Sequence, residues 1–268
     1  MVDFQYMERY DIQDLRRIMA LLRAPGGCPW DREQTHGSIR RNFLEETYEV
    51  LDAIDHDDAT GMCEELGDVL MQVAFHAQIE AERGRFTMAD VVNGVAQKLV
   101  YRHPHVFGDV RADTSQQVLT NWEVLKRREK GQRSTADAVE SVPHTLPALW
   151  RAEKIQSKTA KAGFDWSSAL QALKKLEEEV GELRAALEAG QAPDVSHGIR
   201  EELGDTLFMA AKVAQMSGVD PEDALHRACD KFDRRFRAVE ETADKPLSEC
   251  GEAELLALWD RAKAQDPS

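Results

Sequence analysis

Two sets of carboxylates are the residues of this chain best suited to chemistry. The pentapeptide Glu-Glu-Leu-Gly-Asp occurs at 64–68 and again at 201–205, and each copy follows an earlier Glu-x-x-Glu pair. The first set consists of Glu46, Glu49, Glu65 and Asp68, and the second of Glu179, Glu182, Glu202 and Asp205. Residues three apart lie on one side of a helix. Two such helices placed side by side would gather four carboxylates, and a divalent cation would relieve the repulsion between them.

The donor set contains only oxygen, which favours Mg²⁺ or Mn²⁺ over zinc or copper. An alternative is an ordinary solvated helix face, because Glu favours helices and Glu-x-x-Glu pairs arise easily in an acidic protein. Duplication of the whole set argues against that alternative. A di-iron helical bundle would require Glu-x-x-His pairs, whereas the second pair of each set ends in Asp.

The acidic sets belong to a larger internal repeat. The first acid pairs of the two copies are 133 residues apart and the second pairs 137 apart, so the second copy has a longer loop between them. The shared order continues downstream with a basic pair and a Trp, namely Lys98, Arg102 and Trp122 in the first copy and Lys231, Arg235 and Trp259 in the second. This pattern indicates a tandem duplication. It predicts an N-terminal domain over 1–130, a linker over 131–147 and a C-terminal domain over 148–268.

Helices must position these side chains. Apolar residues recur at three- and four-residue spacing over 43–54, 66–77, 173–187 and 199–214, the pattern of amphipathic helices. Gly- and Pro-containing segments at 24–29 and 190–194 predict loops. Asp220 followed by Pro221 predicts the start of a further helix. Strand-like alternation is scarce, so the sequence predicts an all-α fold.

Basic residues follow the second acidic set. Lys231, Arg234 and Arg235 lie about one helical turn apart, and both side-chain types suit phosphate oxygens. The alternative is a solvated helix face with acidic neighbours. Lys175 precedes Glu179 by one turn, where it can pair with that carboxylate or reach a phosphate beside the metal.

Aromatic and histidine residues give weaker signals. Trp166 and Trp259 are candidates for stacking on a nucleotide base, with a packing role as the alternative. The two histidines of Arg-His-Pro-His at 102–105 lie on an X-Pro segment, which favours a structural role. We assign them no metal.

Composition excludes several classes of protein. The 268 residues carry a net charge of −15, which disfavours a nucleic acid polymer as partner. The four cysteines form no Cys-x-x-Cys pair, which predicts reduced thiols in a cytoplasmic protein. The N-terminus is polar and acidic, unlike a signal peptide, and no apolar run is long enough to span a membrane.

These motifs together resemble the MazG family of nucleoside triphosphate pyrophosphohydrolases. The resemblance covers nearly the whole chain. Besides both pentapeptides, it rests on Gly-Gly-Cys-Pro-Trp-Asp at 26–31, Leu-Glu-Glu-Thr-Tyr-Glu-Val at 44–50, Arg-His-Pro-His-Val-Phe at 102–107, Gly-Phe-Asp-Trp at 163–166 and Lys-Phe-Asp-Arg-Arg-Phe at 231–236. The combination is highly specific, although each motif alone is not.

The resemblance implies two tandem all-α MazG domains, a homodimer, and Mg²⁺-dependent hydrolysis of NTPs and dNTPs between the α and β phosphates. Such an activity would remove unwanted nucleotides from the pool. The implied metal ligands are the carboxylates of the second copy, with those of the first copy as a second set. The implied nucleotide contacts are Lys175, Glu178, Glu201, Asp205, Lys231, Arg234, Arg235 and Trp259.

Three of these residues have expected catalytic roles. Glu178 is a candidate for positioning the attacking water, and Lys231 and Arg235 would stabilise the departing pyrophosphate. The family also implies that the second copy does the hydrolysis, yet the first copy keeps its acids and differs by Tyr101-Arg102 in place of Arg234-Arg235. The rival interpretations are a non-catalytic nucleotide- or metal-binding regulator and a pyrophosphatase for a single nucleotide such as dUTP, dCTP or phosphoribosyl-ATP.

Overall fold

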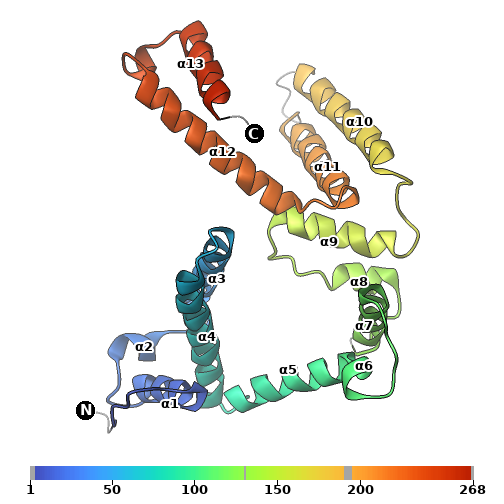
Figure 1. Cartoon of the computed structure of the whole chain (residues 1–268). Coiled ribbons are helices and arrows are strands. Elements are labelled where there is room, and N and C mark those ends of the chain that lie inside the picture. The colour runs from blue at the N-terminus through green and yellow to red at the C-terminus, as the bar shows by residue number, and fades with distance from the viewer. Residues whose placement is uncertain (1–3, 130, 190–194, 267–268) are drawn as a thin grey trace. The chain divides into compact units, whose positions relative to one another are not determined.

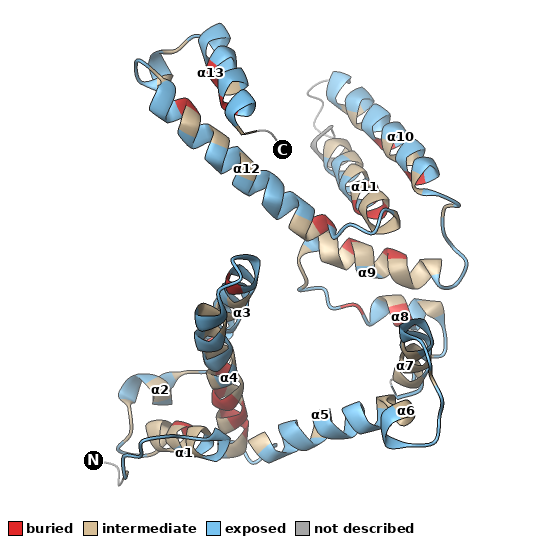
Figure 2. Cartoon of the chain, in the orientation of Figure 1, coloured by how far each residue is buried: buried red, intermediate tan, exposed pale blue. Residues whose placement is uncertain are grey.

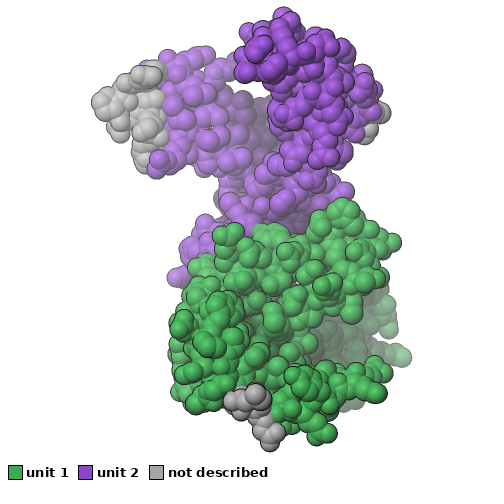
Figure 3. Space-filling model, turned by 90° about the vertical axis from the view of Figure 1, so that its left-hand side faces the viewer, with its two compact units in different colours: residues 1–126 green, residues 127–268 purple. Residues whose placement is uncertain are grey.

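The computed structural model describes residues 4–129, 131–189 and 195–266, and these ranges contain helices and no strand. The all-α expectation is therefore confirmed. The chain divides into two compact units, residues 1–126 and 127–268 (Figure 3). Among the described helices, none is both long and apolar enough to cross a membrane.

The first unit is built around a pair of long helices, α3 (Arg40–Asp55) and α4 (Ala59–Glu82), which pack against each other (Figure 1). Asp58 caps α4 by accepting hydrogen bonds from the backbone N–H groups of Thr60 and Gly61. The other helices of this unit are α1 (Ile12–Arg23), α2 (Pro29–Glu33), α5 (Met88–Arg102), α6 (Pro104–Phe107) and α7 (Ser115–Glu129), the last of which runs across the unit boundary.

The core of the first unit lies where α1 meets the second half of α4. Met19, Phe75 and Ile79 are buried there together with Ile39, which precedes α3 (Figure 2). Arg23 at the end of α1 pairs with Glu82 at the end of α4, with Nε 2.9 Å from Oε1. The first half of α4, which carries the carboxylates, therefore extends beyond this apolar core.

The second unit repeats the helix pair as α10 (Ala169–Glu188) and α11 (Val195–Met216), which also lie side by side (Figure 1). A second pair follows, α12 (Pro221–Thr242) and α13 (Glu252–Gln265), joined by the short 3-10 helix η1 (Leu247–Glu249). Helix α9 (Ala148–Ala160) packs against both α11 and α12, and α8 (Thr135–Glu140) packs against α9.

The helices expected over 43–54, 66–77, 173–187 and 199–214 are confirmed as α3, α4, α10 and α11. Asp220 is the N-cap of α12 and Pro221 its first residue, also as expected. The segment expected as a linker over 131–147 contains α8, because Ser134 and Asp137 form a capping box that starts a helix there. The loop expected at 190–194 lies outside the described residues.

Apolar side chains remain exposed on both carboxylate-bearing pairs. Leu66 on α4 is 50% exposed, and Leu203 and Leu207 on α11 are 46% and 50% exposed. The buried residues of α10 are instead Ala172 and Glu179. The apolar stripes of these helices are therefore only partly covered within the chain.

Candidate metal centres

The second copy places its acids on two packed helices. Ser168 starts α10 by capping the backbone N–H of Gln171. Glu179 on α10 meets Glu202 and Asp205 on α11, and ligand oxygens of all three lie within 4.8 Å of one another. Glu179 is only 7% exposed. A buried carboxylate beside two others is the arrangement expected of a cation site rather than of a solvated face.

The carboxylates of this site repel one another. Burial, and then the negative charges of Glu182 and Asp205, raise the pKa of Glu202 above its ordinary value. Lys175 offsets part of the charge, because its Nζ lies 2.9 Å from Glu179 Oε1 and 3.2 Å from Glu178 Oε2. Hydrogen bonds to these two carboxylates raise the pKa of Lys175.

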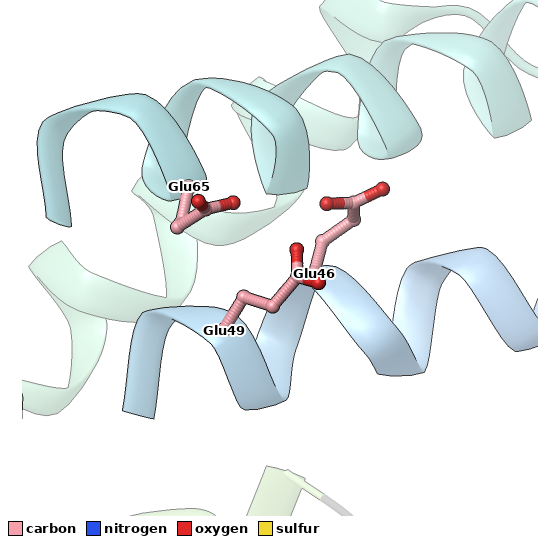
Figure 4. A group of neighbouring side chains, drawn as sticks. All are labelled: Glu46, Glu49 and Glu65. Carbon is pink, nitrogen blue, oxygen red and sulfur yellow. The ribbon is translucent and has the colours of Figure 1, made fainter. Parts of the chain in front are cut away.

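The first copy forms the corresponding cluster (Figure 4). Glu46 and Glu49 from α3 and Glu65 from α4 have ligand oxygens within 4.8 Å of one another. Burial raises the pKa of Glu46, and the charges of Asp68 and Glu49 raise it further. The pKa of Glu65 is raised by burial and then by Glu49. Both duplicated acid sets therefore converge.

The fourth acid of each set stands apart from these groups of three. Glu182 is absent from the second group and Asp68 from the first. Both act on their neighbours through charge, since Glu182 raises the pKa of Glu202 and Asp68 raises the pKa of Glu46. Glu201 likewise raises the pKa of Glu202, so it lies at the edge of the second site.

The expected phosphate-binding residues lie on the other helix pair of the second unit. Arg234 and Arg235 on α12 pair with Asp266 just beyond α13, and the guanidinium of Arg235 also donates to the Asp266 carbonyl at 2.8 Å. Lys231 lines an open hollow of about 400 Å³ with Arg227 and Arg234. Within the described residues, Lys231, Arg234 and Arg235 make no ion pair with the carboxylate cluster.

Trp259 belongs to the packing of α12 against α13. It lies beside the buried Val239 and Leu258, and its ring centroid is 5.2 Å from that of Phe232. Trp166 lies near a different group, since Lys212 Nζ is 5.8 Å from its ring centroid. Both tryptophans are half-buried.

Gln72 and Lys212 are buried polar residues in the helix pairs that escaped the sequence interpretation. Gln72 is 6% exposed on α4, and Lys212 is 1% exposed on α11. Both lie among apolar residues at helical spacing, so the periodic pattern hides them. Comparison of the two copies would have revealed them, because the 137-residue offset aligns Gln72 with Met209 and Lys212 with Phe75.

The donor chemistry fits a hard divalent cation at both clusters. All converging ligand atoms are carboxylate oxygens, and burial together with repulsion from the neighbouring acids raises the pKa of Glu202 and of Glu46. Mg²⁺ and Mn²⁺ take such ligands, whereas zinc and copper sites normally include nitrogen or sulfur.

Fold and site together define an all-α protein with a duplicated carboxylate site. Comparison with known proteins identifies its family. The MazG nucleotide pyrophosphohydrolase domain matches residues 34–107 and again 167–239, more than half of the chain. The chain therefore belongs to the MazG family, as its motifs predicted, and is an enzyme of that class.

The match extends to full-length relatives. The nucleoside triphosphate pyrophosphohydrolase of Escherichia coli K12 is 43% identical over 95% of this chain and 98% of its own length. The nucleoside triphosphate pyrophosphohydrolase/pyrophosphatase MazG of Thermotoga maritima is 42% identical over 95% of this chain and 96% of its own. A nucleoside triphosphate pyrophosphohydrolase of Mycobacterium tuberculosis is 35% identical over 97% of this chain and 71% of its own.

Proposed function

We propose that this protein hydrolyses NTPs and dNTPs between the α and β phosphates with Mg²⁺, or Mn²⁺ in its place, at the second carboxylate cluster. The observation that carries the proposal is the convergence of Glu179, Glu202 and Asp205 beside Lys175. A chelated triphosphate presents both the cation that the acids need and the anionic oxygens that a lysine binds. The names of the relatives support the same reaction.

In the proposed reaction, water attacks in line at phosphorus and the bond between the α and β phosphates breaks, leaving a nucleoside monophosphate and pyrophosphate. Glu179, Glu182, Glu202 and Asp205 would hold the cation, which when bound neutralises phosphate charge and lowers the pKa of water. The side chain of Glu178 is 64% exposed, and only its Oε2 is paired with Lys175, so its other oxygen would orient the water. Lys175 would exchange a carboxylate for a phosphate oxygen.

Lys231, Arg234 and Arg235 would bind the departing pyrophosphate, with Trp259 beside the nucleotide. Asp266 holds Arg235 at a side-chain exposure of 11% and so fixes the direction of its guanidinium. These residues lie on the α12–α13 pair and the acids on the α10–α11 pair. A complete site thus requires the two pairs, from one chain or from two, to close around the nucleotide.

We further propose that the chain acts as a homodimer. The support is the set of half-exposed apolar residues on the carboxylate-bearing helices, among them Leu203 and Leu207. Burial of such a stripe against a second copy would remove it from water, a gain of about 25 cal/mol per Å² of apolar surface. The four free cysteines are in keeping with a cytoplasmic protein that serves the nucleotide pool.

The test is pyrophosphate release from a panel of NTPs, dNTPs and oxidised nucleotides by the wild type, Glu202→Gln and Glu65→Gln. We expect loss of turnover in Glu202→Gln and retention in Glu65→Gln. Full activity of Glu202→Gln would overturn the assignment to the second copy. Nucleotide binding without any turnover in the wild type would favour a binding regulator instead.

A further inference from the structure

Two histidines of the first unit face each other close to the start of α3. His36 lies in the segment between α2 and α3, and His76 lies on α4. Their Nδ1 atoms are 2.7 Å apart, and their ring planes differ by 13°. The ring centroids are 5.0 Å apart, which exceeds the distance between the nitrogens by about the width of one imidazole ring. Each Nδ1 therefore points at the other, and the rings meet head to head rather than face to face.

A neighbouring carboxylate determines which ring supplies the proton for this contact. The other ring nitrogen of His36, Nε2, lies 2.5 Å from Glu80 Oε1. The hydrogen bond from His36 lowers the pKa of Glu80, so this carboxyl is ionised at neutral pH and can only accept. Neutral His36 consequently carries its proton at Nε2, and its Nδ1 accepts a hydrogen bond from the Nδ1–H of His76.

One further proton fits this chain of hydrogen bonds, and a second does not. With the first, the proton between the rings moves to His36 and His76 takes the new proton at Nε2, so the positive charge lies on His36 beside Glu80. With the second, both rings carry a proton at Nδ1, and two donors oppose each other where no hydrogen bond can form. Burial, and then the charge of His36, lower the pKa of His76 below its ordinary value of 6.5.

The charged neighbours of the pair come from α4, the turn after it, and α1. Arg83 and Arg85 face the pair through Glu80, whose oxygens lie 3.2 Å from Arg83 Nη1 and 2.6 Å from Arg85 Nε. Arg23 of α1 donates to the backbone carbonyl of Gln34 at 3.2 Å. Because arginine stays charged, this contact anchors the preceding part of the segment at any pH of interest.

The start of α3 depends on such contacts because no side chain caps it. Its N-cap residue is Ile39, which is 2% exposed in the core and makes no capping hydrogen bond. Phe43 in the first turn packs against His76, with ring centroids 5.8 Å apart. Within the described residues, α3 contributes no charged partner to either histidine. The histidine contact thus secures the chain just before the helix that carries Glu46 and Glu49.

We propose that His36 and His76 form a pH-sensitive clamp that holds the start of α3 against α4, closed while a proton is shared between the rings and opened when both rings are protonated. The second copy has no counterpart, since the 137-residue offset places Val213 and Ser217 at the positions of His76 and Glu80. The clamp goes beyond the proposed hydrolysis and does not depend on it.

The direction of the pH response follows from the lowered pKa of His76. At acid pH the closed clamp binds fewer protons than the open one, so a falling pH favours opening. The contribution of the clamp to stability is complete above the ordinary histidine pKa of 6.5. It is lost as the pH falls below that value and through the lowered pKa of the folded state.

The test is hydrogen exchange of the full chain at pH about 7.5 and about 5, read by mass spectrometry of peptides over 34–44 and corrected for the intrinsic exchange rate. Protection in the wild type should fall about tenfold at the lower pH. In His76→Asn the amide can donate from the position of Nδ1 and cannot gain a proton, so protection should be equal at both pH values. His226→Asn, at an exposed histidine of the second unit, is the control and should respond as the wild type does.

Two results of this experiment would overturn the clamp: equal protection of the wild type at both pH values, or an acid-induced loss that persists in His76→Asn. The second result would point instead to carboxylates such as Glu46 and Glu65, which remain in that variant. Nitrogen NMR of the wild-type histidine rings supplies a second measurement if His76→Asn does not fold. The rings of His36 and His76 should gain their protons in two separate steps, and independent titration of the two rings would contradict the proposal.

Discussion

Lys175 Nζ lies 2.9 Å from Glu179 Oε1, so the second cluster contains its own counter-charge before any nucleotide arrives. The first cluster has Asn42 at the matching position. This difference changes the charge balance between two carboxylate sites that are built on corresponding helix pairs. A lysine within a metal cluster weakens the hold on a bare cation and favours a ligand that brings both a cation and anionic oxygens.

Replacement of Lys175 by Met should therefore separate metal binding from turnover. In a Glu65→Gln background, which disables the first cluster, Lys175→Met should strengthen Mn²⁺ binding without nucleotide. It should also lower kcat/KM for nucleotides about a hundredfold, the usual effect of removing one charge-stabilising group. The matched control is Lys174→Met, since Lys174 is exposed and takes part in none of the ion pairs found among the described residues. Similar effects at both lysines would contradict the role of Lys175.

The stability of the protein at acid pH should depend on a second network of charged residues, which surrounds Glu80 in the first unit. This carboxylate is 5% exposed and accepts from His36 and Arg85. The His36 hydrogen bond and then the charge of Arg85 lower the pKa of Glu80 below its ordinary value of 4.5. A carboxyl with a depressed folded-state pKa stabilises the fold above its unfolded-state pKa, and this contribution is lost as the pH falls through the folded value.

Glu80→Gln should consequently have a lower free energy of unfolding than the wild type at neutral pH. The two free energies should become equal as the pH falls well below 4.5. Chemical denaturation across this range measures the difference. Glu45→Gln serves as control, because the side chains of the Arg41–Glu45 pair are 86% and 47% exposed and such pairs contribute little. If the free energies of unfolding of the wild type and Glu80→Gln differed by the same amount at all pH values, the role of Glu80 ionisation in stability would be refuted.

Sequence spacing predicted the helix pairs and the acid sets, because a one-turn interval fixes which residues share a face whatever the packing. It could not predict that Glu182 and Asp68 would lie outside the groups of three, since side-chain reach depends on the helix crossing. Nor could it predict that Asp266 would hold Arg235, a contact made by the chain beyond α13. Gln72 was hidden because one amide in an apolar stripe barely alters the periodicity.

Dimer formation should depend on the exposed apolar residues of α11. Leu207 is 50% exposed, and Leu207→Glu would place a charge in the surface that we expect a second copy to cover. Light scattering coupled to size exclusion should show a dimer for the wild type and a shift toward monomer for the variant. Leu256→Glu on α13, at 58% exposure, is the control and should remain dimeric. A wild type that is monomeric at all concentrations would refute the homodimer.

The buried lysine of α11, Lys212, should be energetically coupled to Asp165, and a double variant is needed to measure this coupling. Lys212 is 1% exposed, with Nζ 2.5 Å from Asp165 Oδ1 and 2.7 Å from Gln215 Oε1. Lys212→Met should lower the free energy of unfolding by about 2 kcal/mol, because Asp165 is left unpaired but keeps some contact with water. Adding Asp165→Asn should restore most of this loss, since the first copy packs Phe75 at the position of Lys212 without any ion pair.

Guanidinium denaturation of the wild type, both single variants and the double variant measures the coupling. Simple additivity of the two single effects would show that Lys212 and Asp165 do not depend on each other.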